Sequence, residues 1–327
     1  MAKLVTIFGG SGFVGRQVAR LMAKEGWRVR IAVRRPDEAL FTRTYGAVGQ
    51  VVPVMCNIRD ENSVRAALTD ADAAVNCVNI LAPEGRSTFG NVFEGGAETI
   101  ARLSAEMGVA RLVHISGLGI DADSPSAYVA SKSRGEAKVL AARPDAVILR
   151  PSVIFGAGDN FYNRLAGLTR LGPVMPMLSP DTRMQPVHVD DVAMAAAMGA
   201  DGRAEPGIYE LGGPEVMTMR EISGQVIEAV GRKRLRLAVP MPLARLGAMA
   251  GGVLRVLTGG LVSPPVSRDQ LVLLTQDNVV SEGARGFAEL GISPTAPEAV
   301  IADYLWRFSP SGQYDAIKRS AKNLRDQ

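Results

Sequence analysis

Three glycines spaced three residues apart interrupt an apolar run close to the start of the chain. The segment 4–8 is largely apolar, as in a buried strand of a parallel sheet, and apolar residues return at helical spacing after residue 15. Glycine lets a backbone turn tightly toward a pyrophosphate, and the free amides that open the next helix face phosphates. The pattern therefore predicts a dinucleotide-binding loop, with an ordinary strand-turn-helix corner as the alternative. The loop residues are Gly9, Gly10, Ser11, Gly12, Phe13, Val14 and Gly15.

The length and composition set the expected architecture. With 327 residues, 47% of them hydrophobic, the chain is long enough to bury a full core. We expect an α/β fold, a Rossmann-type doubly wound parallel sheet with a small C-terminal α+β lid domain. The expected boundaries are a dinucleotide-binding domain over 1–157 with 185–212 returning to it, a lid or interaction portion over 158–184 and 213–310, and a polar basic tail over 311–327.

Several classes of function are disfavoured by composition. The net charge of +4 comes with only 5% aromatic residues and no concentrated basic face, so no nucleic-acid partner is expected. Cys56 and Cys77 read as packing residues and His114 as a hydrogen-bonded core histidine. Together with His188 they follow no metal-ligand spacing, so no metal is predicted. No apolar run is long enough to span a membrane. The first strand begins almost at residue 1, which predicts a bacterial protein without a signal or transit peptide.

A second strand over 28–33 ends beside the place of an adenine ribose. NAD-selective sites carry an acidic residue there, whereas a 2′-phosphate calls for arginine. Arg34 and Arg35 occupy this place and no acid does. Bidentate, charge-assisted bonds from these two residues predict a preference for NADPH (NADP) over NAD. A solvated basic turn before Pro36 is the alternative.

Two further strands supply candidate cofactor contacts. The strand 51–55 is followed by Asn57, Ile58, Arg59 and Asp60, where an adenine ring would rest and the short polar side chain of Asn57 can bond its amino group. A turn and helix cap would explain the same residues. The strand 72–78 ends in small residues up to Val78, over which a cofactor can pass. We also expect helices over 91–107 and 218–230, a strand over 235–239, and Asp190 as the N-cap of the helix that follows it.

The strand 111–115 leads to Ser116, and a helix opens near Tyr128 and contains Lys132. A tyrosine and a lysine four residues apart on a helix lie on one face. An ammonium group beside a phenol lowers its pKa and makes it a usable general acid or base. Tyr128 and Lys132 are therefore the candidate catalytic pair, with Ser116 a weaker candidate.

These motifs resemble the extended or atypical branch of the short-chain dehydrogenase/reductase family. The likeness rests on the glycine loop, the Tyr128 and Lys132 pair, the segment 150–156 and the segment 187–193. It implies that Tyr128 carries the substrate proton, that Lys132 also holds the nicotinamide ribose, and that a serine polarises the substrate. Pro151 and Ile154 of the third motif join the implied cofactor-binding set.

The serine is where this sequence departs from that family. Active members usually place it one or two residues beyond Ser116, where this chain has Gly117 and Leu118. Loss of a hydrogen-bond donor there removes substrate polarisation. The resemblance then implies retained cofactor binding with the chain's own catalysis lost.

The C-terminal half narrows the resemblance to the dinucleotide-binding accessory subunits of respiratory complex I (NADH:ubiquinone oxidoreductase). The segments that carry it are 185–191, 209–214, 268–280, 290–292 and 304–314. It implies tightly bound NADPH and a non-catalytic role in assembly and stability at the peripheral arm, where it meets the membrane arm. The implied partners are other complex I subunits, and the implied location is the cytoplasmic side of the bacterial inner membrane.

Two apolar or basic segments bear on membrane contact. The stretch 242–257 is apolar and interrupted only by arginines, which suits a membrane surface. The tail 311–327 is basic and suits anionic lipid or another subunit. Core packing of the lid and an unstructured terminus are the respective alternatives.

A second function remains open from the sequence. The chain could be a soluble NADP-dependent short-chain reductase or epimerase that acts on a small substrate through Tyr128 and Lys132. The intact Tyr-Lys pair favours this enzyme, whereas Gly117 and Leu118 favour the accessory subunit.

Overall fold

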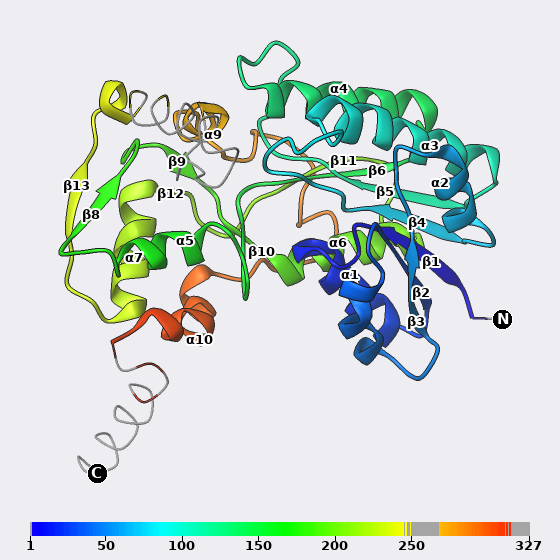
Figure 1. Cartoon of the computed structure of the whole chain (residues 1–327), viewed down its shortest axis with the longest axis horizontal. Helices are drawn as coiled ribbons and strands as arrows, with labels where there is room; N and C mark the ends of the chain where they lie inside the picture. Colours follow the sequence, from blue (N-terminus) through cyan, green and yellow to red (C-terminus); the bar gives the residue numbers. More distant parts are fainter. Residues whose placement is uncertain are drawn as a thin grey trace. The chain divides into compact units, whose positions relative to one another are not determined.

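Seven parallel strands form the central sheet of the computed structural model, in the order β3-β2-β1-β4-β5-β6-β11 (Figure 1). The strand order reverses between β1 and β4, as it does in doubly wound dinucleotide-binding sheets. The predicted Rossmann-type parallel sheet is therefore confirmed. The strands are β1 (Leu4–Phe8), β2 (Arg28–Val33), β3 (Val51–Met55), β4 (Ala73–Asn76), β5 (Arg111–Ile115), β6 (Val147–Pro151) and β11 (Gly207–Leu211).

Helices cover both faces of this sheet (Figure 1). One face carries α2 (Glu61–Leu68), α3 (Ala97–Glu106) and α4 (Ala127–Ala142), and the other carries α1 (Phe13–Lys24) and α6 (Val189–Asp201). Because both faces are covered, the strands are apolar rather than alternating, as the sequence predicted. The core under the first face includes Phe8, Val64, Ile100, Leu112, Val139 and Ile148.

The helix predicted over 91–107 has a different start in the structure. Gly90–Gly96 forms a wide π-helical segment, and α3 begins only at Ala97. The segment lies against α4 so closely that a β-carbon added at Gly135 would fall 2.0 Å from the Phe93 carbonyl oxygen. The rings of Phe89 and Phe93 stack with centroids 5.7 Å apart on this segment.

Asp190 is not the N-cap of α6, which corrects the sequence prediction. The helix begins one residue earlier, at Val189, and Asp190 lies in its first turn. Its carboxylate pairs instead with Arg20 of α1, with 3.1 Å between Oδ2 and Nη2. The acidic side chain therefore joins two helices that pack on the same face of the sheet.

A second unit contains short strand pairs and helices. Its core includes Phe155, Tyr162, Ile222, Val226 and Leu305. The predicted helix over 218–230 is α7 (Met219–Val230), which opens with a capping box from Thr218 and Glu221. The strand pairs are β7 (Ile154–Phe155) with β10 (Val187–His188), β9 (Arg183–Met184) with β12 (Met217–Thr218), and β8 (Val174–Met177) with β13 (Leu235–Ala238). Further helices among the described residues are α5 (Tyr162–Leu168), α9 (Arg268–Leu273) and α10 (Ile301–Leu305). Their 3₁₀ segments are Asp37–Tyr45 in the first unit and Pro297–Ala299 and Trp306–Phe308 in the second.

The structure describes residues 2–244, 246, 249, 268–310, 312 and 314. Most of the stretch 242–257 and of the tail 311–327 lies outside these residues. Within them, no helix is both long and apolar enough to cross a bilayer. The first unit spans Met1–Ser152, Val189–Gly212 and Val280–Pro294, and the second spans Val153–His188, Gly213–Val279 and Thr295–Gln327.

Candidate functional site

The glycine loop after β1 turns as tightly as the sequence predicted. Gly9 has a φ of +73°, which favours glycine, and its amide donates to the carbonyl oxygen of Ala32 at 3.0 Å. The amide of Gly12 in turn donates to the carbonyl oxygen of Gly9 at 3.0 Å. A β-carbon added at Gly15 would lie 2.4 Å from that same oxygen, so only glycine lets α1 come this close to the loop.

The loops that follow β1 and β4 meet where the strand order reverses. A β-carbon added at Gly9 would lie 3.1 Å from the amide nitrogen of Val78. Gly12 is the N-cap of helix α1, which has no side-chain cap and no acidic residue in its first turn. Its amides and the positive end of its dipole therefore stay available to an anion. These features fit the pyrophosphate of an extended dinucleotide.

Arg34 and Arg35 follow β2 directly and are both exposed, but they differ in their partners. Arg35 forms an ion pair with Glu38 at 2.8 Å, and this hydrogen bond is the main reason that its pKa is raised. Arg34 instead donates from Nη1 to the hydroxyl of Ser87 at 3.4 Å. Arg34 is thus the arginine whose charge has no carboxylate partner among the described residues.

Asn57 lies in a turn that leads into α2. Its Oδ1 accepts from the backbone amide of Arg59 at 3.2 Å, and the N-cap of α2 is Asp60. The alternative of a turn and helix cap over Asn57–Asp60 is therefore confirmed, and the adenine contact of Asn57 stays a prediction. Ile58 packs with Val78 against an aromatic cluster. The cluster consists of Phe89, Val92 and Phe93, with Ile58, Val78, Ile80 and Tyr128 against it.

The Tyr-Lys pair lies at the start of α4, where Ser126 caps the helix. The Lys132 ammonium donates to the carbonyl oxygen of Ser116 at 3.1 Å and lies 5.6 Å from the centre of the Tyr128 ring. The Tyr128 hydroxyl donates to Oδ1 of Asn79 at 3.2 Å. The tyrosine is thus held by an amide side chain from the loop after β4.

Ser116 offers its backbone rather than its side chain. Its hydroxyl is buried and has no hydrogen-bond partner within the described part of the chain. Leu118 is buried, and its amide donates to the Pro151 carbonyl oxygen at 3.0 Å. A β-carbon added at Gly117 would lie 3.9 Å from Cδ of Lys132, so the position where active members carry the serine has space beside the lysine.

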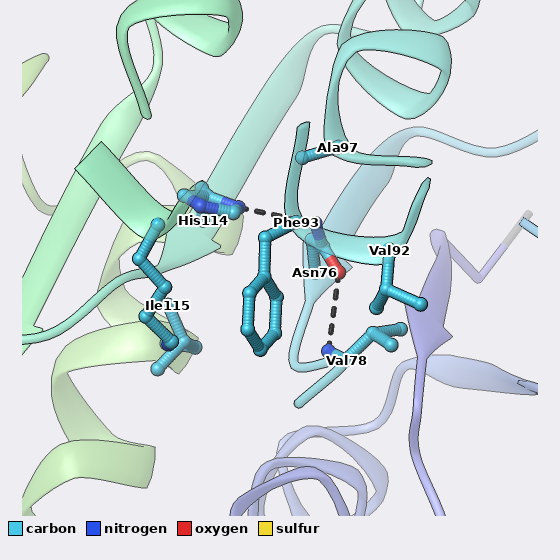
Figure 2. Close-up of a pocket in the computed structure, with 8 residues that line it drawn as sticks. Asn76, Val78, Val92, Phe93, Ala97, His114 and Ile115 are labelled. Atoms are coloured by element: carbon cyan, nitrogen blue, oxygen red, sulfur yellow. Dashed lines mark hydrogen bonds between the residues drawn. The ribbon is translucent and has the colours of Figure 1, made fainter. Parts of the chain in front are cut away.

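A small pocket lies at the carboxyl ends of β4 and β5, and two of its lining residues, Asn76 and His114, are hydrogen-bonded to each other (Figure 2). Asn76 accepts from the Val78 amide at 3.1 Å through Oδ1, so its Nδ2 faces Nδ1 of His114, also at 3.1 Å. Burial, with Lys132 nearby, lowers the pKa of His114 to about 3. His114 is therefore a neutral acceptor at Nδ1, which matches the predicted core histidine. The pocket is lined by Asn76, Val78, Val92, Phe93, Ala97, His114, Ile115 and Lys132.

The predicted site residues fall in both units. The glycine loop, Val78, Ser116, Tyr128 and Lys132 belong to the first unit, as do the arginines after β2. Pro151 ends β6 in the same unit, whereas Ile154 lies in β7 of the second.

Sequence reasoning missed the loop between β4 and the π-helical segment. This loop supplies Asn79 to Tyr128 and Ser87 to Arg34. The sequence signals this loop through a run of small, polar and turn-forming residues between two apolar elements. Such a run does not predict which residues the loop contacts.

The cysteines carry no site of their own. Burial raises the pKa of Cys56 to about 11 and that of Cys77 to about 12, so both stay thiols near neutral pH. No group of three or more potential metal ligands occurs in the residues that the structure describes.

Comparisons with known proteins identify a family, and the relatives they find differ in function. The RmlD substrate binding domain family matches residues 2–246. The mitochondrial NADH dehydrogenase (ubiquinone) 1 alpha subcomplex subunit 9 of Arabidopsis thaliana is 30% identical over 316 residues, which are 94% of this chain and 79% of that protein. A ceramide reductase of Caulobacter vibrioides is 33% identical over 190 residues, 58% of each chain.

A solved structure supports the fold across the chain. The dTDP-glucose 4,6-dehydratase of Bacillus anthracis, in complex with NAD, superposes with a TM-score of 0.67. The match covers 93% of this chain and 96% of that chain at 15% identity.

Proposed function

The chain belongs to the short-chain dehydrogenase/reductase family, within its RmlD-like group, and on that premise we propose that it is an accessory, non-catalytic, NADPH-binding subunit of bacterial respiratory complex I. The mitochondrial relative, which matches almost the whole chain, supports the assignment to complex I. The first unit would hold the nucleotide. The lid or interaction portion, 158–184 and 213–310, would meet other subunits.

The main support for a non-catalytic role is the absence of a serine at positions 117 and 118. The glycine loop and the Tyr-Lys pair are intact, but Gly117 and the buried Leu118 stand where a substrate-polarising hydroxyl belongs. The Ser116 hydroxyl lies buried without a partner in the described residues, and Lys132 bonds its carbonyl oxygen instead. Without a donor at the substrate oxygen, the developing negative charge is not stabilised.

The end of β2 supports NADPH over NAD. An acid that would bond the ribose hydroxyls is absent, and Arg34 has no carboxylate partner in the described part of the chain. The proposed nucleotide contacts in the first unit are Gly9, Gly10, Ser11, Gly12, Phe13, Val14, Gly15, Arg34, Arg35, Asn57, Ile58, Val78, Tyr128, Lys132 and Pro151.

Bound nucleotide can matter in such a subunit without reacting. A ligand that binds only the folded state stabilises it, by about 3 kcal/mol when its free concentration is about a hundred times the Kd. NADPH would in this way keep the first unit folded while the complex assembles and would persist in the finished complex.

Contact with the membrane is part of the proposal, at the cytoplasmic face and without a span. Strand β13 supports it just ahead of the stretch 242–257, because Leu235 is 66% exposed and Leu237 is 55% exposed. Lys233 is exposed just ahead of them. Leucines with a neighbouring cation suit a surface of anionic phospholipid.

Vesicle flotation tests this contact. The full chain should float with vesicles that contain anionic phospholipid, and Leu235→Gln with Leu237→Gln should reduce the bound fraction several-fold. The matched control Leu81→Gln changes an exposed leucine of the first unit and should leave binding unchanged. Equal binding by all three proteins would refute a role for β13.

Respiration with a Tyr128→Phe variant tests the accessory function. Membranes that carry the variant should keep nearly full NADH:quinone oxidoreductase activity, because the phenol transfers no proton in this role. Deletion of the chain should lower the amount of assembled complex. If Tyr128→Phe reduces activity as strongly as deletion does, the non-catalytic role is wrong.

A soluble NADP-dependent reductase or epimerase is the second candidate. It is favoured by the intact pair of Tyr128 and Lys132 and by the similarity to a ceramide reductase. Asn79, which holds the Tyr128 hydroxyl, also carries an amide donor that a substrate oxygen could use. On this function the chain would remain in the soluble fraction, and Tyr128→Phe would abolish its turnover.

A further inference from the structure

The hydroxyl of Ser87 lies beside Arg34 although the two residues are far apart in the sequence. The guanidinium donates from Nη1 to the Ser87 Oγ across 3.4 Å, and the serine is only 7% exposed. Ser87 belongs to the loop between β4 and the π-helical segment, whereas Arg34 follows β2. Two loops at the carboxyl ends of the strands thus converge on one point.

The backbone fixes the position of Ser87. Glu84 and Ser87 face each other in an antiparallel bridge, with amide-to-carbonyl distances of 3.1 and 2.9 Å. Gly85 has a φ of +53° and allows the sharp turn between them. Because the bridge uses only main-chain atoms, the Ser87 side chain is not needed to hold the loop.

Of the two arginines after β2, Arg34 is the one without an ion pair in the described part of the chain. Arg35 has its ion pair with Glu38 and is also attracted by Glu84 and Asp37. Arg34 has no carboxylate within ion-pair distance among the residues described. An anion that arrives at the end of β2 would therefore meet Arg34 first.

A hydroxyl that accepts from an arginine keeps its own proton for another acceptor. In the described residues the Ser87 hydroxyl has Arg34 as its hydrogen-bond partner and has no acceptor for its own proton. A 2′-phosphate offers three oxygens and so can bond the guanidinium and the hydroxyl together. A free ribose 2′-hydroxyl brings no such charge.

We propose that Ser87 is a specificity-determining residue of the nucleotide site, which donates to the 2′-phosphate beside Arg34. This inference rests on the proposed binding of NADPH and adds a ligand from a loop that no sequence motif marks. The same loop is anchored at Tyr128, through Asn79 at 3.2 Å and through the ring of Phe89 at 5.6 Å.

Nucleotide titration of the purified full chain, stripped of bound nucleotide, tests the proposal with NADPH and NADH as probes. Ser87→Ala should raise the Kd for NADPH about tenfold, the usual effect of losing one charge-assisted hydrogen bond. The Kd for NADH should stay within about twofold, because that nucleotide lacks the phosphate. Ser87→Asp should weaken NADPH further, by about a hundredfold, because its carboxylate repels the phosphate.

Ser104→Ala is the matched control. Ser104 is another buried serine of the first unit whose hydroxyl accepts from an arginine, here Nη1 of Arg143 at 3.1 Å. Its substitution should leave both Kd values unchanged. The unchanged Kd for NADH also shows that each Ser87 variant is folded.

Four results would overturn the inference. Ser87→Ala could bind NADPH as tightly as the unsubstituted chain, or it could lose affinity for NADPH and NADH equally. Either result would refute the role of Ser87 and leave the proposed function unaffected. If the unsubstituted chain binds NADH as well as NADPH or binds neither, the nucleotide preference on which the inference rests falls with it.

Discussion

The Lys132 ammonium donates a hydrogen bond to the backbone carbonyl oxygen of Ser116 across 3.1 Å. The lysine is therefore held at the carboxyl end of β5, beside the ring of Tyr128, by main-chain geometry that does not depend on the serine side chain. Under the proposed function, Lys132 would bind the nucleotide ribose from this position although Gly117 supplies no substrate-polarising hydroxyl. Nucleotide binding would then persist without catalysis.

A serine introduced at Gly117 should be accepted by the fold. An added β-carbon would meet its nearest atoms, in Ile120 and Lys132, at an ordinary 3.9 Å. Gly117→Ser should therefore change the free energy of unfolding by no more than about 0.5 kcal/mol. Urea denaturation measures this, and NADPH oxidation with small carbonyl compounds shows whether the hydroxyl restores turnover. A loss above about 2 kcal/mol would mean that the position is not open.

The two arginines after β2 should contribute unequally to NADPH affinity. Arg35 is paired with Glu38 and its side chain is 74% exposed, whereas Arg34 lacks an acidic partner in the described residues. We expect Arg34→Ala to weaken NADPH binding at least about tenfold and Arg35→Ala only about two- to threefold. Isothermal titration with NADPH and NADH measures both. If the double variant retains NADPH, the 2′-phosphate role is refuted.

Gly15→Ala should damage the first unit. The new β-carbon would lie 2.4 Å from the Gly9 carbonyl oxygen and 2.8 Å from the Gly10 Cα, and backbone atoms cannot move aside cheaply. A loss of about 3 kcal/mol in the free energy of unfolding is expected, together with loss of NADPH binding. Gly172→Ala is the control, because a β-carbon there meets no atom within 4 Å. Equal stability of the two variants would contradict this account of the loop.

Buried His114 should make stability depend on pH. Its pKa falls from the usual 6.5 to about 3 in the folded chain, chiefly through burial. Between these values the unfolded state binds one proton more, so stability decreases as the pH falls, by about 1.4 kcal/mol per pH unit. From pH 6 to pH 4 the chain should lose about 2 to 3 kcal/mol more than a His114→Gln variant does. Parallel pH profiles for the two proteins would show that His114 titrates normally.

The central sheet could be predicted because its signals are local. Leu4 to Phe8 forms an apolar strand, and Gly9, Gly12 and Gly15 mark the turn and the close helix within the next few residues. Such short-range patterns are decided by steric rules of the backbone. The resemblance to complex I accessory subunits is likewise confirmed by the mitochondrial relative.

The contacts that finish the site could not be predicted because they are long-range. Asn79 and Tyr128 are 49 residues apart, and Ser87 and Arg34 are 53 apart. Both pairs depend on the path of one irregular loop, which composition does not specify. The prediction that Asp190 caps α6 was wrong for a related reason. Its carboxylate forms an ion pair with Arg20 on another helix, and this long-range contact is not visible in the local sequence.

The most direct test of the whole account is purification of the native chain from its own membranes with a mild detergent, followed by identification of the proteins and nucleotide that remain with it. The account predicts stoichiometric complex I subunits and about one NADPH per chain. Recovery of the chain alone in the soluble fraction, free of nucleotide or turning over a substrate in a Tyr128-dependent way, would contradict it.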